Sequence, residues 1–424
     1  MDEHLVKACE RFLMLLPEND IDTMKLAYAL NQFEMNANQV SIATEKLPIY
    51  HDLEYKGIRM LICEYIKQFC EIFTKGDGRL RCEVSVPSPL FLIMVYQNAG
   101  IGKWRFSTDA LIAQIVLRSI FLYDRPFFET DLHMRFCGLN RMRLELMNHF
   151  ACLMQFGILC DECIKCSEAN SKKNINVCYP KGSEAMQRKM LAEITAEFIS
   201  ECEENLGLSI EPTDKKSAMK QYGRLLHIQN VLVNLHDRID RAPLKGNSFA
   251  LAQTVQLTVF DNWNRPLEAL EILAKELKSA PVSENIKRMY CFYTPFLQPQ
   301  IDELFRRNGV QLMGSAVFLY HGSRLSFSLK EMVADWLFGM NVRENAVTEA
   351  EYIANEIKRN GCCAYLTGMY SLDRWMGPAA MIHSRVLEER DSIPTFFLDV
   401  DFWEGGKNLT ERIETICSVL NQKY

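Results

Sequence analysis

Apolar residues recur at helical spacing in two stretches near the start of the chain. Side chains that repeat every three to four residues fall on one face of a helix, which can pack against a core. The turn Lys75-Gly76-Asp77-Gly78 interrupts this pattern. The spacing therefore predicts an N-terminal helical segment over residues 1–76. The positions that carry the pattern are Leu5, Ala8, Phe12 and Leu15, then Met60, Cys63, Ile66, Phe69, Cys70 and Phe73.

A different pattern begins after this turn. Residues 80–86 are rich in strand-forming side chains and lead through Pro87 and Pro89 into an apolar helix that ends at Gly100. A strand, a loop and a helix in this order are typical of the start of a parallel α/β layer. Helical spacing then dominates from 184 to 280. We therefore expect a first α/β domain over 77–183 and a helical connecting region over 184–280.

Strand and helix patterns alternate again from 281 to 424. Short apolar runs at 288–293, 310–313, 362–367 and 393–398 predict strands, with helical patterns between them. Parallel strands joined by helices bind ligands beyond their carboxyl ends, here the loops 294–297, 368–375 and 399–406. The predicted fold is α/β, with two Rossmann- or flavodoxin-like parallel-sheet domains, the second at 281–424, linked by a helical region and preceded by the helical segment.

Composition and charge narrow the class of protein. The 424 residues exceed the roughly 250–300 at which one core stops growing, and 48% hydrophobic with 24% charged residues is ordinary for a soluble chain. The net charge of −6 argues against nucleic acid as a partner, because phosphate binding needs a basic surface. The N-terminus is acidic where a signal peptide is basic, and no apolar run reaches the roughly 20 residues of a membrane span. We expect a cytoplasmic protein without membrane contact.

The chain contains 15 cysteines, and three of them are closely spaced. Cys160-x2-Cys163-x2-Cys166, with Cys178 further on, resembles the thiolate spacing of bacterial ferredoxin clusters, although the last gap is much longer here. Cys137 and Cys152 are additional candidates in the same region. An iron–sulfur cluster, a structural zinc and free thiols are three readings of this segment.

The order of the C-terminal elements is more specific than any one of them. Arg307-Asn308-Gly309 and Arg359-Asn360-Gly361 each end a helix before a strand, and Ile393-Pro394-Thr395 enters the last strand. A glycine loop, Gly405-Gly406-Lys407, then leads into a helix that carries Arg412. This order resembles the C-terminal half of the 2-hydroxyacyl-CoA dehydratase and benzoyl-CoA reductase family, in particular the dehydratase D-component. A weaker resemblance extends back to about residue 80.

The resemblance implies a dimer of related subunits that holds a four-iron, four-sulfide (4Fe-4S) cluster with cysteine thiolates. In this family an ATP-dependent activator protein supplies one electron, which the cluster passes to a CoA thioester. Cys160 matches the middle ligand of the family, and Cys82 is the candidate for the first ligand. Tyr370 stands where the last thiolate is expected, so the chain diverges in its cluster ligands. The expected metal ligands are Cys160, Cys163, Cys166 and Cys82.

The resemblance also suggests residues that do not bind metal. Ser371 and Asp373 occupy the loop that faces the active centre in the family and are the catalytic candidates. Lys407 and Arg412 are candidates for binding the CoA phosphates, with capping or surface roles as the alternative. The carboxylates Asp399, Asp401 and Glu404 follow the last strand, where a functional role and simple solvation are both common.

The function implied is a subunit of a 2-hydroxyacyl-CoA dehydratase-like, or benzoyl-CoA reductase-like, iron–sulfur enzyme that acts on CoA thioesters by one-electron radical chemistry in anaerobic metabolism. Its partners would be a related dehydratase subunit, as a heterodimer or homodimer, and the activator. The alternative is a homologue without a cluster that serves as a scaffold or dimerisation subunit, and Tyr370 leaves enzyme activity open. A third reading is a double-cubane-type reductase of the same family that acts on small molecules.

Overall fold

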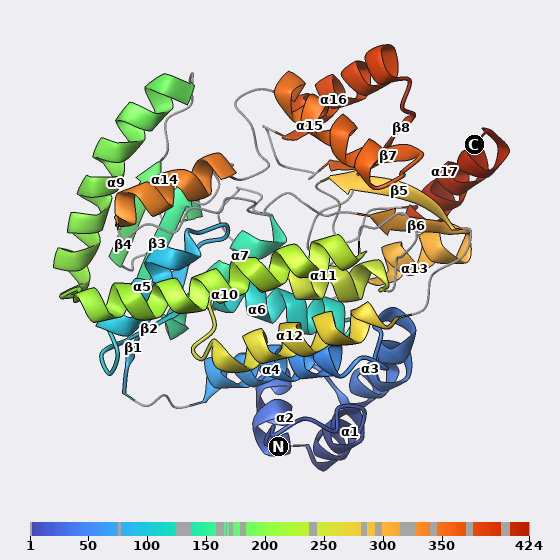
Figure 1. The fold of residues 1–424 in the computed structure, drawn as a ribbon. Coiled ribbons are helices and arrows are strands. Elements are labelled where there is room, and N and C mark those ends of the chain that lie inside the picture. Colours follow the sequence, from blue (N-terminus) through green and yellow to red (C-terminus); the bar gives the residue numbers. More distant parts are fainter. Residues whose placement is uncertain are drawn as a thin grey trace.

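The computed structural model describes residues 2–74, 78–123, 137–157, 165, 166, 168, 173–178, 184–236, 244–280, 286–292, 299–313, 328–339, 346–369, 376–399 and 408–423. Within these residues the chain forms two four-stranded parallel sheets surrounded by helices (Figure 1). The predicted α/β class, with two parallel sheets and an N-terminal helical segment, is confirmed.

The N-terminal segment consists of four helices. Asp2 caps the first helix through His4 N, and Asn36 and Gln39 form a reciprocal capping box at the third. The fourth helix lies against α12 at Gly57, where an added Cβ would approach Leu273 Cβ to 2.5 Å. The helices are α1 Glu3–Leu13, α2 Thr23–Asn31, α3 Ala37–Tyr50 and α4 Lys56–Phe73.

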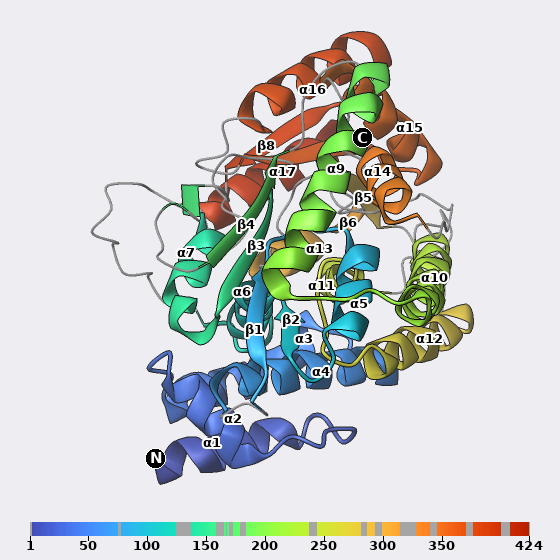
Figure 2. The same ribbon diagram turned by 90° about the vertical axis from the view of Figure 1, so that its left-hand side faces the viewer.

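Sheet A has the order β2-β1-β3-β4, and helices cover both of its faces. Figure 2 shows α6 and α7 on one side of the sheet and α5 and α9 on the other. Its strands are β1 Leu80–Val84, β2 Trp104–Ser107, β3 Cys152–Gly157 and β4 Lys173–Cys178. Around them lie α5 Leu90–Ala99, α6 Asp109–Gln114, the π-helix Ile115–Ile120, α7 Gly138–Glu145 and the 3-10 turn Met147–His149.

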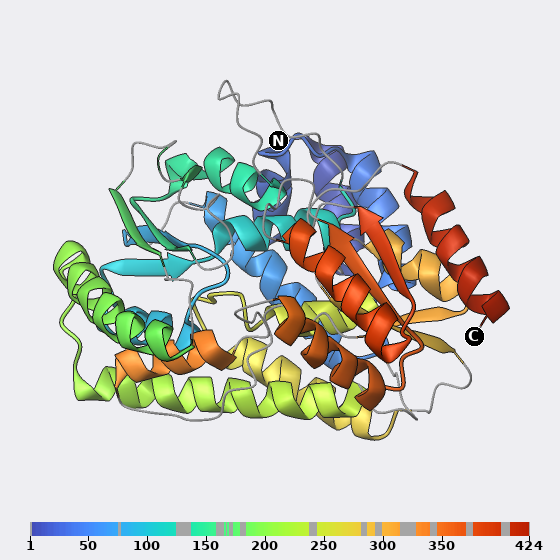
Figure 3. The same cartoon turned by 90° about the horizontal axis from the view of Figure 1, so that it is seen from above.

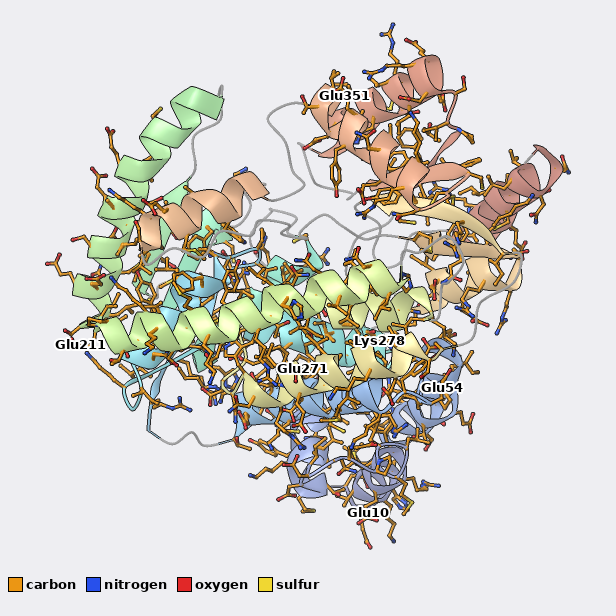
Figure 4. All side chains as sticks on the ribbon, viewed as in Figure 1. Glu10, Glu54, Glu211, Glu271, Lys278 and Glu351 are labelled. Carbon is orange, nitrogen blue, oxygen red and sulfur yellow. The ribbon has the colours of Figure 1, made fainter. Side chains whose placement is uncertain are left out.

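Long helices form the connecting region, as the pattern predicts. Glu271 of α12 lies beside α10 (Figure 4), and Arg224 Nη2 donates to its Oε2 at 2.8 Å. Glu276 of the same helix caps α4 by accepting from Lys56 N at 2.9 Å and Gly57 N at 3.1 Å. The helices are α9 Glu184–Leu206, α10 Pro212–His236, α11 Gly246–Thr254 and α12 Asn264–Lys278.

Sheet B has the order β6-β5-β7-β8 and stands beside sheet A (Figure 3). One apolar cluster joins one face of the sheet to α13 and α17, and a second joins the other face to α15 and α16. The strands are β5 Lys287–Phe292, β6 Val310–Met313, β7 Ala364–Met369 and β8 Thr395–Asp399. The helices are α13 Pro299–Arg307, α15 Ala346–Arg359, α16 Met376–Asp391 and α17 Leu409–Lys423.

One helix from the second half of the sequence belongs to the first half in space. Helix α14, Leu329–Gly339, follows β6 but packs against α5 and α9 beside sheet A (Figure 1). Its buried residues Met332, Val333 and Trp336 join the large core that runs from α1 to α12. We call this core with its elements the first lobe, and sheet B with α13 and α15–α17 the second lobe. The domain boundaries at 76, 183 and 280 stay predictions.

Candidate functional site

In each sheet the direction in which strands are added reverses once, between two neighbouring strands. We call this place the switch point, and it is where a ligand-binding site is expected. In sheet A the chain passes from β1 to β2 on one side and then to β3 on the other. The same order in sheet B places its switch point between β5 and β7. Ligands of open parallel sheets bind at such points, outside the carboxyl ends of the strands. The strands concerned end at Val84, Gly157, Phe292 and Met369.

The end of β1 is fastened to β3 at the first switch point. Ser85 N donates to Met154 O at 2.8 Å, and Phe156 N donates to Ser85 Oγ at 2.8 Å. A cis peptide joins Val86 to Pro87 directly after this contact. Cys160 follows Gly157, the end of β3, by three residues in the sequence. The predicted middle ligand therefore comes directly after a switch-point strand.

Two thiols contact Asn140 in the first turn of α7. Asn140 Nδ2 donates to Cys137 Sγ at 3.6 Å, and Cys166 Sγ donates to Asn140 O at 3.9 Å. Cys137 is the N-cap residue of α7, and Arg143 donates to Asn140 Oδ1. Cys166, predicted from spacing, thus shares a partner with Cys137.

Cys82 lies in a different environment. It is fully buried in the middle of β1, with Cys152 as its Cα partner on β3. Burial, and then the neighbouring Cys152 thiol, raise the pKa of Cys82 well above its ordinary value. Burial likewise raises the pKa of Cys202 on α9. Such protonated thiols pack as small apolar groups, so the role of Cys82 as a ligand stays a prediction.

In the described part of the chain, no three His, Cys, Asp or Glu side chains are grouped so that they could hold a metal ion. Five residues singled out from the sequence lie outside the described residues: Cys160, Cys163, Ser371, Asp373 and Lys407. Tyr370 and the carboxylates Asp401 and Glu404 lie outside them as well.

Arg412, a candidate for binding the CoA phosphates, lies in the described part of the second lobe. It lies in the first turn of α17, and its Nη2 donates to Phe397 O of β8 at 3.3 Å. This contact fastens α17 to β8 two residues before the strand ends at Asp399. Arg412 is therefore close to the carboxyl edge of sheet B, as a ligand-binding role requires, and it also makes the structural contact that was the alternative.

Three buried side chains are linked by hydrogen bonds next to β7, one of the two strands of the second switch point. The sequence pattern does not predict this link, which we call the Glu349–His383–Tyr365 chain. His383 Nε2 lies 2.9 Å from Glu349 Oε2, and His383 Nδ1 lies 3.3 Å from Tyr365 Oη. All three side chains have no exposed surface. They join α15, α16 and β7, and the loop 370–375 runs between β7 and α16 in the sequence. The bond between Tyr365 and His383 therefore joins β7 to α16, the elements that precede and follow residues 370–375 in the sequence.

A comparison with protein families agrees with this architecture. The family model of the 2-hydroxyglutaryl-CoA dehydratase D-component matches residues 110–418. The chain belongs to this family. The match to the D-component begins in α6 and ends in α17, so it includes the cysteine run and all of sheet B. Cys82 and the helices α1–α5 lie before it. The resemblance proposed from the sequence is confirmed.

A sequence search among curated proteins finds no match to the chain. None of the described helices combines the length and the apolar character that a membrane crossing needs.

Proposed function

We propose that this D-component-like chain is a cytoplasmic subunit of an iron–sulfur enzyme that acts on CoA thioesters by one-electron radical chemistry. Its reaction would be that of a 2-hydroxyacyl-CoA dehydratase or of a benzoyl-CoA reductase. The observation that carries the proposal is the family match over residues 110–418, which includes three of the four switch-point strands. Function depends on particular sites as well as on the fold, so the ligands need their own argument.

The contacts around α7 support a cluster bound by the cysteine run. Cys160, Cys163 and Cys166 are the proposed ligands, and Cys137 is a better fourth thiol than Cys82. Cys137 shares Asn140 with Cys166, whereas Cys82 is enclosed within sheet A and its pKa is raised by burial. A bound 4Fe-4S cluster would supply a single electron of low potential. The chain's own contribution would be to bring Cys137 and Cys166 to Asn140 in the first turn of α7.

The second lobe would then contribute to substrate binding. Ser371 and Asp373 would face the thioester, and Lys407 with Arg412 would contact the CoA phosphates. Arg412 supports this assignment because its guanidinium contacts β8 at Phe397, two residues before the strand ends. A related subunit and an ATP-dependent activator are the proposed partners, as in other members of the family.

Reconstitution tests the proposal. The chain would be produced anaerobically with the products of its neighbouring genes, including an activator ATPase, and supplied with 2-hydroxyacyl-CoA or aromatic acyl-CoA thioesters. We expect ATP-dependent turnover that disappears when this chain is left out. Full turnover in its absence would contradict the proposal.

Tyr370 favours a second candidate, a subunit without a cluster that serves as a scaffold or in dimerisation. In that case the purified chain would be colourless and would form a stable complex with a relative that has every ligand cysteine. A tightly bound cluster in the chain itself would exclude this candidate.

A further inference from the structure

The largest contacts between the two lobes lie at one edge of sheet B. Among the described residues, α13 and β6 of the second lobe lie against α3 and α11 of the first (Figure 1). Helix α11 belongs to both cores, because Ala250 packs into the cluster of sheet B while Phe249 and Leu251 pack into the core of the first lobe. Strand β6 is an edge strand, and the described parts of α15 and α16 make no contact of this extent with the first lobe. The second lobe is therefore attached mainly along one side.

Two buried hydrogen bonds join the lobes at the start of α11. Asn247 Nδ2 donates to Pro299 O of α13 at 3.0 Å, and Gln311 Nε2 of β6 donates to Leu244 O at 2.9 Å. Asn247 and Gln311 are each 1% exposed, so water does not compete for these bonds. The two bonds fix α13 and β6 to the turn that begins α11. We call residues 244–248, 299–302 and 311 the α11 junction.

The first lobe holds this turn through Asp52, which lies between α3 and α4. Asp52 Oδ2 accepts from Lys245 N at 2.7 Å, and Asp52 N donates to Ser248 Oγ at 2.8 Å. Lys245 Nζ lies 3.8 Å from Asp52 Oδ1 and donates to Pro48 O at 3.0 Å. Burial raises the pKa of Asp52, and the charge of Lys245 opposes this shift. These bonds keep the start of α11 on the first lobe.

Asp302 faces the start of α11 from the second lobe, and it lacks such partners. Asp302 is 1% exposed, and neither of its carboxyl oxygens has a hydrogen-bond partner among the described residues. Burial of a carboxylate without hydrogen bonds is unfavourable, whereas burial of a neutral carboxylic acid is much less so. The contact between the lobes should therefore weaken when Asp302 becomes charged, because separation of α13 from α11 lets water reach that charge.

The charges around Asp302 come from α13 itself and from the first lobe. Burial is the main cause that raises the pKa of Asp302 to about 6, and the charge of Asp52 adds to it. Arg306, on the same helix, and the backbone amides of Gly246 and Asn247 oppose the shift. Asp302 is therefore mainly protonated in weak acid and mainly charged at neutral pH.

The other titratable groups of the helices that pack here are neutral or paired near pH 6. Burial lowers the pKa of His51 to about 4 and raises the pKa of Tyr50, so neither side chain is charged in this range. Glu303 Oε1 accepts from Arg307 Nε at 2.7 Å. Strand β6 and helix α17 contribute apolar side chains to the cluster that contains the buried face of α13.

We propose that the α11 junction is a pH-sensitive latch between the lobes, closed while the Asp302 carboxyl group is neutral and loosened when it is charged. Asp52 keeps α11 on the first lobe in both states, while the bonds of Asn247 and Gln311 break when the latch opens. The second lobe then turns about this edge as a unit, because sheet B and its helices have clusters of their own. Such a turn changes the distance between the carboxyl ends of the two sheets. The latch does not depend on the dehydratase reaction.

Hydrogen–deuterium exchange of the full-length protein tests the latch. The protection factor, which corrects for the intrinsic effect of pH on exchange, should fall in peptides from α13 and β6 as the pH rises. We expect a fall of roughly 50-fold between about pH 4 and about pH 7, which follows from the ordinary pKa of 3.8 and the folded-state pKa of about 6.

Two variants decide whether Asp302 is responsible. Asp302→Asn should remove the fall in the protection factor. Asp391→Asn is the matched control and should keep it, because Asp391 pairs with Lys358 of α15 on the opposite face of sheet B from α13. A constant protection factor in the unmodified protein, or the same fall in Asp302→Asn, would overturn the proposal.

Two further measurements remain informative if Asp302→Asn does not fold. Arg306→Gln removes a charge that lowers the pKa of Asp302, so the midpoint of the fall should move to higher pH; an unchanged midpoint would mean that Asp302 is not the titrating group. In the unmodified protein, peptides from α13 and β6 should also have lower protection factors than peptides from α4. Equal protection would mean that the junction opens only when the whole protein unfolds, which would contradict a latch.

Discussion

The two lobes have sheets of the same strand order, but the faces of these sheets are filled differently. Under sheet B, the Glu349–His383–Tyr365 chain is closed by direct hydrogen bonds and surrounded by apolar residues of α15 and α16. Under sheet A, Glu83, Asp109 and Arg143 are joined mainly through backbone amides and long charge contacts. Sheets with the same strand order can therefore bury different polar groups, in one case a hydrogen-bonded chain and in the other a pair of acidic side chains. Strand order determines the path of the backbone and does not determine which side chains lie on each face.

The largest expected effect comes from the buried guanidinium of the first lobe. Arg143→Leu leaves the Glu83 and Asp109 carboxyl groups without their nearest partner from α7, which should lower the free energy of unfolding by about 3–5 kcal/mol. Denaturant unfolding measures this change. Arg390→Leu on the second lobe is the control, because its ion pair with Glu351 is exposed and should contribute nothing measurable. Equal losses in the free energy of unfolding for the two variants would contradict the claim that the buried guanidinium stabilises its lobe more than the exposed one does.

The contact between the lobes should respond to pH. Asp302 of α13 is buried next to the start of α11, and burial raises its pKa to about 6. The folded state therefore binds a proton on Asp302 more tightly than the unfolded state does. The stabilisation of the folded state by this proton is complete below the ordinary pKa of 3.8 and is lost as the pH rises through about 6. The free energy of unfolding should fall by about 3 kcal/mol across that window relative to Asp302→Asn. Parallel pH profiles for the two proteins would contradict this account.

The first lobe is also distinguished by the close packing of α4 on α12. Gly57→Ala adds a Cβ that would lie 2.6 Å from Ala269 O, so α4 and α12 must separate. We expect a loss of about 1–3 kcal/mol in the free energy of unfolding, which thermal or denaturant unfolding detects. Gly78→Ala gives a comparison at a glycine whose added Cβ would meet nothing within 4 Å, although its positive φ strains the new residue. No loss at Gly57 would show that the packing of α4 on α12 is loose.

The smallest effect is expected at the end of the buried chain in the second lobe. Tyr365→Phe removes a hydroxyl that lies 3.3 Å from His383 Nδ1 and keeps the ring in place. The free energy of unfolding should fall by about 0.5–1.5 kcal/mol, the usual net contribution of one hydrogen bond. Denaturant unfolding checks the value, and a loss of several kcal/mol would mean that the chain holds the lobe together.

Local pattern was enough to predict the long amphipathic helices and the apolar strands of the second lobe. Strands β2 and β4 were missed for local reasons, since β2 has only four residues and β4 has asparagines at two of its six positions. The return of α14 to the first lobe was also missed. The contacts of α14 with α5 and α9 join residues far apart in the sequence, and a local hydrophobic pattern does not predict such contacts.

The same distinction holds for the site. Cys166 could be singled out from the sequence because two residues separate each of three successive cysteines, a spacing with a known chemical meaning, and its role as a ligand stays a prediction. Cys137 was only an additional candidate, because the fold alone brings Cys166 to Asn140, three residues after Cys137. The Glu349–His383–Tyr365 chain joins residues 34 and 18 positions apart and has no local signature.

Iron and acid-labile sulfide in the anaerobically purified protein test the central proposal most directly. We expect about one 4Fe-4S cluster per chain in the unmodified protein, retention of the cluster in Cys202→Ser, and its loss in Cys166→Ser. Cys202 is the matched control because its thiol is buried in α9 and kept protonated. An unmodified protein without iron, or equal iron in both variants, would contradict the account.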